Sequence, residues 1–81
     1  MNRKERGLTD IIHAWLHTHK ERLAYPGKMR ANDFIKYNKG VIKAIYDQMR
    51  QEYNMERSKM LDACFVQGVT EYLKAEKLLV V

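Results

Sequence analysis

The apolar residues of this chain recur every three or four positions along most of its length, which is the spacing of one face of an α-helix. Between Gly40 and Gly68, twenty-seven residues include neither glycine nor proline, so no backbone preference there interrupts a helix. The pattern predicts an all-α protein: a small bundle of three helices over residues 9–24, 32–53 and 57–77, within one domain of residues 1–81.

Local signals define the ends of the first predicted helix. Thr9 is the expected N-cap, because its hydroxyl can accept a hydrogen bond from a free amide of the first turn. Pro26 and Gly27 end the helix, since the residue before a proline is disfavoured in the helical conformation. Residues 1–7 are then expected to form a flexible basic arm that carries Arg3, Lys4 and Arg6.

The second and third predicted helices are separated by a weaker signal. Asn32 is the expected N-cap of the second helix, and Gly40 within it is interpreted as a tolerated or kinking glycine, with a break as the alternative. We expect a turn near residues 53–58, where Asn54 or Ser58 can cap a new helix. One long helix from 41 to 77 stays an alternative, because apolar residues keep a seven-residue spacing across the turn.

The third predicted helix is apolar over more than half of its circumference, which is too wide for one contact face. A chain of 81 residues has only a small core, so the excess indicates a second subunit. We therefore expect a homodimer through this helix, with an interface of Met60, Phe65, Val69, Tyr72 and Leu73.

Charge is distributed unevenly along the chain, whose net charge is +5. Residues 1–50 hold eleven Lys or Arg against five Asp or Glu, whereas residues 51–81 hold four against five. This asymmetry favours an anionic partner for the first half, such as nucleic acid or an acidic protein surface. The alternative is a solvated basic face that serves solubility.

Cations recur on one face of the predicted second helix and in the turn before it, at Lys28, Arg30, Lys36, Lys39, Lys43 and Arg50. Such a row can neutralise phosphates, whereas the face has few side chains that read base edges. A helix-turn-helix is disfavoured because Lys36 occupies a position that usually needs a small residue. Tyr25 and Tyr37 flank the basic positions, and the other aromatic residues are expected in the core.

Other candidate chemistry is weaker. Asp10, His13 and His17 share a helical face that could bind zinc, but the glutamate of the H-E-x-x-H motif and a third histidine are missing, so we expect neither metal nor cofactor. Cys64 lies mid-stripe and is expected to be a buried thiol. No leader peptide is recognisable and the longest apolar run is too short for a membrane span, which favours the cytoplasm.

These features predict a small basic regulator or accessory protein that is not an enzyme and that contacts the backbone of DNA or RNA through its second helix. The alternative is a protein–protein interaction module, an inhibitor or adaptor, that docks its basic face on an acidic protein. Compact chains of this kind are frequent among phage and mobile-element proteins, which is an association and not a physical argument.

Overall fold

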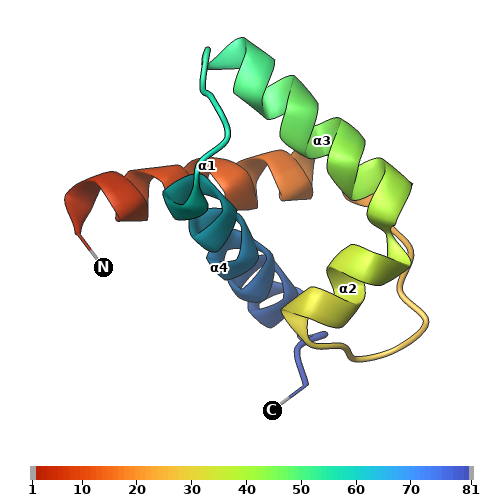
Figure 1. Ribbon diagram of the computed structural model, residues 1–81. Helices are drawn as coiled ribbons and strands as arrows, with labels where there is room; N and C mark the ends of the chain where they lie inside the picture. The colour runs from red at the N-terminus through yellow and green to blue at the C-terminus, as the bar shows by residue number, and fades with distance from the viewer. Residues whose placement is uncertain (1, 81) are drawn as a thin grey trace.

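The computed structural model describes residues 2–80, so Met1 and Val81 of the predicted domain lie outside the described part. It is all-helical, as predicted, but residues 2–80 form four α-helices and not three (Figure 1). The elements are α1 (Arg3–Thr18), a short 3₁₀ turn η1 (Lys20–Arg22), α2 (Ala31–Tyr37), α3 (Lys39–Glu52) and α4 (Lys59–Ala75). None of these helices has the length and apolar character that crossing a lipid bilayer requires.

The start of α1 corrects the predicted flexible arm, because residues 3–7 are helical. Asn2 caps the helix: its side chain accepts a hydrogen bond from the Glu5 amide at 2.9 Å. Thr9, the predicted cap, lies inside the helix, where its buried hydroxyl donates to the Glu5 carbonyl at 2.8 Å. The helix ends at Thr18, earlier than predicted, and η1 leads into the loop that holds Pro26 and Gly27.

The predicted second helix is bent into two at Asn38, which is buried. Its side chain accepts a hydrogen bond from the Ala24 amide at 2.8 Å and donates to the Ala24 and Phe34 carbonyls at 3.1 and 3.2 Å. The bend thus satisfies the polar groups of a loop from elsewhere in the sequence. The N-cap of α2 is Arg30, without a side-chain hydrogen bond, and not the predicted Asn32.

The turn predicted near residues 53–58 is present, so the single helix from 41 to 77 is excluded. Asn54 has a left-handed backbone with φ 51°, and the Met55 amide donates to the Arg50 carbonyl at 2.8 Å. This hydrogen bond closes the C-terminal end of α3 in a Schellman motif. Ser58 then caps α4 by accepting from the Leu61 amide at 3.0 Å.

The closest helix packing joins α1 to α4, and the two helices run in the same direction. Cys64 lies against Glu5, Gly68 against Thr9 and Ile12, and Tyr72 against His13. A Cβ at Gly68 would lie only 2.5 Å from Cγ2 of Ile12. Glycine is therefore what allows the α4 backbone to approach α1.

The burial of α4 within the single chain removes the argument for the predicted dimer interface. Phe65, Val69, Tyr72 and Leu73 are at most 5% exposed within the single chain. Both α1 and α2 pack against α4, and Tyr46 of α3 contacts Phe65, so three helices of the same chain contribute to covering α4. Met60 alone of the five predicted interface residues is exposed, at 37%. The argument for a second subunit through these residues therefore fails.

The residues after α4 fold back on the loop before α2. The Met29 amide donates to the Leu78 carbonyl at 2.9 Å, and the Val80 amide donates to the Met29 carbonyl at 3.1 Å. These two bonds make an isolated parallel β-bridge between Met29 and Leu79. The end of the described chain is thus held within the molecule.

Candidate anion-binding surface

The bend at Asn38 divides the predicted row of cations. Lys28 and Arg30 lie before α2, Lys36 lies in its last turn, and Lys39, Lys43 and Arg50 belong to α3. All of them are exposed except Arg50, which is partly buried. The structure therefore presents two groups of cations on two helix axes and not one continuous face.

The α3 cations are partly neutralised by Asp47. Its carboxylate lies 3.4 Å from Nζ of Lys43 and 3.2 Å from Nη1 of Arg50. The Arg50 guanidinium also lies 5.7 Å from the centre of the Tyr46 ring, within the range of a cation–π contact. Both side chains are consequently less available to an external anion than the sequence suggests.

The cations around α2 are different, because Lys28, Arg30, Lys36 and Lys39 form no ion pair with any residue between 2 and 80. Tyr37 lies between Lys36 and Lys39 in sequence and is 56% exposed. Tyr25, the other tyrosine predicted beside the cations, stacks on Phe34 and hydrogen-bonds with the Tyr72 hydroxyl. Tyr25 is thus structural, and Tyr37 is the aromatic side chain that faces solvent.

A groove of about 810 Å³ lies between α3 and the beginning of α4. Its apolar lining includes Ile35, Ile42, Met55 and Phe65, and its cations are Lys39, Lys43, Arg50 and Arg57. Arg57 was not among the predicted cations, because it lies in the turn before α4 and only its charge distinguishes it in the sequence. Its guanidinium lies 3.5 Å from the Asp62 carboxylate and 5.9 Å from the centre of the Tyr46 ring.

Tyr46 joins the two sides of this groove. Its hydroxyl donates to the Asp62 carboxylate at 2.5 Å, and its ring lies 4.7 Å from that of Phe65. Burial raises the pKa of Tyr46 to about 12, and the hydrogen bond to Asp62 acts in the same direction. Tyr46 is therefore a neutral structural bridge at physiological pH.

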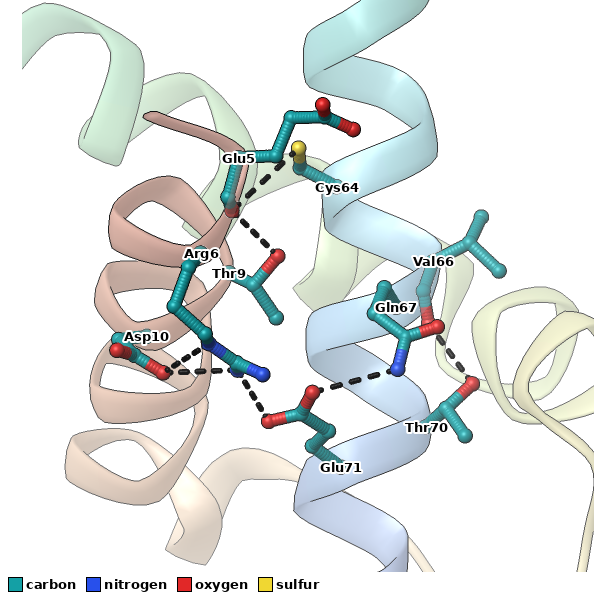
Figure 2. A network of polar contacts seen from close by, with 9 residues as sticks. All are labelled: Glu5, Arg6, Thr9, Asp10, Cys64, Val66, Gln67, Thr70 and Glu71. Atoms are coloured by element: carbon teal, nitrogen blue, oxygen red, sulfur yellow. Dashed lines mark hydrogen bonds and ion pairs between the residues drawn. The ribbon is translucent and has the colours of Figure 1, made fainter. Parts of the chain in front are cut away.

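Arg6, predicted in the flexible arm, instead joins α1 to α4 (Figure 2). Its guanidinium lies 2.8 Å from the Asp10 carboxylate and 2.5 Å from that of Glu71. The hydrogen bond from Arg6 lowers the pKa of Glu71. In the same view, the buried Cys64 thiol points at the Glu5 carbonyl at 3.8 Å, in the structural position expected for it.

The three side chains considered as zinc ligands, Asp10, His13 and His17, have other contacts or face solvent. Asp10 is engaged by Arg6, His13 meets the edge of the Tyr72 ring at 6.2 Å, and His17 is exposed. Over the described part of the chain, no three Asp, Glu, His or Cys side chains come together as metal ligands.

A second, more apolar cleft of about 380 Å³ lies beside α1. Trp15 stacks on His19 and meets Tyr53 edge-on, with ring centres 5.7 and 6.4 Å apart. Because these rings contact one another, the cleft is mainly an aromatic packing surface. Its charge does not indicate a particular ligand.

Comparison of the chain with protein-family models, with curated proteins and with solved structures gives no match. The functional argument therefore depends on the geometry and charge of these surfaces.

Proposed function

We propose that this protein is a small non-enzymatic regulator or accessory factor of the cytoplasm that contacts the phosphate backbone of nucleic acid. The observation that supports the proposal is the exposed Tyr37 between Lys36 and Lys39, two exposed lysines without a carboxylate partner. Asn38 lies between them and is fixed by its hydrogen bonds to Ala24 and Phe34. A rigid bend thus carries two cations and an aromatic ring.

Each element of this arrangement has a defined role. Lysines neutralise phosphates and release counterions, which gives affinity without sequence preference. An exposed aromatic ring can stack on an unpaired base of either DNA or RNA, so single-stranded nucleic acid is the preferred ligand. Lys28 and Arg30 extend the positive surface, whereas Lys43 and Arg50 contribute less because they share Asp47. The expected homodimer is not needed for this function.

Fluorescence anisotropy with a labelled single-stranded oligonucleotide of mixed sequence tests the proposal. Replacing Lys36 and Lys39 with glutamine should make the slope of log affinity against log salt shallower by about 1.4, or roughly 0.7 for each lost contact. Tyr37→Ala should weaken binding by roughly tenfold through the loss of stacking.

The matched control replaces Lys4 of α1 and Lys59 of α4 with glutamine. It removes the same amount of charge at a distance from α2. Both control lysines are exposed near the start of α1 or α4, whereas α2 contacts the far part of α4 through Phe34 and Tyr72. This control should retain affinity. Failure of the unmodified protein to bind the oligonucleotide at low salt would refute the proposal.

A second function is favoured by the groove between α3 and α4. Its apolar lining is not needed for phosphate contacts, but it suits a protein partner, and its cations favour an acidic one. The groove thus supports a protein–protein interaction module, an inhibitor or adaptor, as the second candidate.

A further inference from the structure

We infer that the groove between α3 and α4 is a docking site for an acidic amphipathic α-helix of a partner protein. The inference depends on the second candidate function and specifies the chemistry of its partner.

The first step is the arrangement of the helices around the groove. Both α3 and α4 pack against α1, but their backbones stay apart from each other. They are joined by side chains, chiefly by Tyr46, which contacts Phe65 and Asp62. A further helix laid between α3 and α4 would therefore cover the exposed sides of two helices without displacing a neighbour.

The second step is size. The groove follows α3 from Lys39 to the turn at Asn54, and Ile35 of α2 lies at one end of it. At 1.5 Å per residue, this path is about 22 Å long, which matches a helix of about 15 residues. The walls are helices whose backbone groups are already paired, so an extended peptide would find no strand edge there.

The third step is the distribution of apolar and charged residues. Of the apolar side chains that line the groove, Ile35 and Met55 are partly exposed and can receive apolar residues of the partner, whereas Ile42 and Phe65 are each 5% exposed. Lys39, Lys43 and Arg50 belong to α3, and Arg57 lies in the turn between α3 and α4. These four cations outnumber the two carboxylates, Asp47 and Asp62, so the rim favours acidic residues beside the apolar stripe of the partner.

The same features disfavour two other occupants. Nucleic acid would find the Tyr46 ring already contacted by the guanidinium groups of Arg50 and Arg57, and its phosphates would gain nothing from the apolar part of the lining. A second copy of this chain carries a net charge of +5 and would bring like charge to a positive rim.

The test uses a fluorescein-labelled peptide of about 15 residues with leucine at every third or fourth position and glutamate elsewhere, matched to the groove length. A control peptide has the same composition with its leucines spaced so that no helical stripe forms. The amphipathic peptide should bind at least about tenfold more tightly, and its addition should shift the NMR signals of the Ile42, Tyr46 and Phe65 amides.

Charge reversal locates the site. Lys43→Glu combined with Arg57→Glu should weaken binding of the amphipathic peptide by about tenfold or more, because like charges then face each other. Lys4→Glu combined with Lys59→Glu changes the net charge equally outside the groove and should have a much smaller effect. Circular dichroism of both variants checks that the helices are retained.

Any of these results would overturn the inference: no binding of the amphipathic peptide, NMR shifts confined to the Trp15 cleft, equal losses in both charge-reversed variants, or displacement of the peptide from the groove by an oligonucleotide. Equal binding of the two peptides would also overturn it, but protein docking would survive as a function because the groove would then accept acidic chains in general. The nucleic-acid proposal is judged separately by oligonucleotide binding and by Lys36 and Tyr37, which do not line the groove.

Discussion

The two sides of α4 are built differently, although both are apolar. On the α1 side, Gly68 lets the backbones approach until no space remains for a Cβ. On the α3 side, the large rings of Phe65 and Tyr46 span the gap and leave a groove above them. The size of the contact residues thus decides which side of an apolar helix is sealed and which stays accessible.

Gly68→Ala should have the largest effect on this contrast, since the new methyl group would collide with Ile12, a fully buried side chain. Overpacking of a close helix contact costs about 3 kcal/mol of unfolding free energy at the upper end of the usual range. Thermal and denaturant unfolding followed by circular dichroism measure the loss.

Gly40→Ala is the matched control, because a Cβ at Gly40 meets no atom within 4 Å. Gly40 lies in α3, where alanine is the better helix former, so this variant should be more stable by about 0.5 kcal/mol. Equal losses in the two variants would show that the α1–α4 contact is no tighter than an exposed helix surface.

Asn38→Ala should have the next largest effect, because it removes the group that sets the direction of α3 relative to α2. The substitution deletes three hydrogen bonds and leaves the Ala24 amide and carbonyl without that partner. We expect a loss of about 2 kcal/mol in unfolding free energy. Asn32→Ala, at an exposed position of α2, should change stability by less than about 0.5 kcal/mol.

Tyr46→Phe tests the open side of α4, since it keeps the ring contact with Phe65 and removes the hydrogen bond to Asp62. The expected cost near neutral pH is about 1 kcal/mol. The pKa of Tyr46 is raised from 10.0 to about 12, so its neutral form stabilises the fold below pH 10. That contribution disappears as the pH rises from 10 to 12.

The pH dependence gives a second measurement on the same variant. Between pH 10 and 12, urea unfolding of the unmodified protein should lose stability more steeply than that of Tyr46→Phe. Parallel curves would indicate that Tyr46 ionises as freely in the folded protein as in the unfolded chain.

The smallest effect is expected at the end of α4, away from both sides. Lys77 has a left-handed backbone with φ 60°, and the Leu78 amide donates to the Leu73 carbonyl at 2.8 Å, as in a Schellman motif. Glycine adopts this conformation without strain, so Lys77→Gly should raise stability by about 0.5 kcal/mol. Lys74→Gly, within the helix, should lower it by a similar or larger amount.

Local features of the fold were predictable from the sequence. The helical class, the Pro26–Gly27 loop and the turn before Ser58 follow from spacing, proline chemistry and capping. Asn2 was a missed local signal, because a capping residue three positions before Glu5 marks a helix start. Gly40 indicated a possible break nearby, but the position of the bend at Asn38 depends on hydrogen bonds to Ala24, which is distant in sequence.

The candidate site was predictable in residue type, and part of its availability was predictable as well. Charge alone selected Lys43 and Arg50, but Asp47 lies four residues after Lys43 and three before Arg50 in α3, a spacing that by itself indicates both ion pairs. The apolar stripe of α4 was recognised from its spacing. Spacing alone could not show that Tyr72 and Leu73 are covered by other parts of the same chain, and it therefore favoured a dimer interface. Which elements cover an apolar helix face is decided by tertiary packing, and residue spacing along one helix does not reveal it.

The parallel pairing of α1 with α4 has a consequence for how the chain folds. Its main helix contact joins segments such as Glu5 and Cys64, 59 residues apart, whereas an up-and-down bundle would form many contacts between consecutive helices. Closing so long a loop costs about 1.5 kcal/mol more in chain entropy than closing one of about 10 residues. The protein should consequently have a high relative contact order for an all-α chain and fold more slowly than helical bundles of its size.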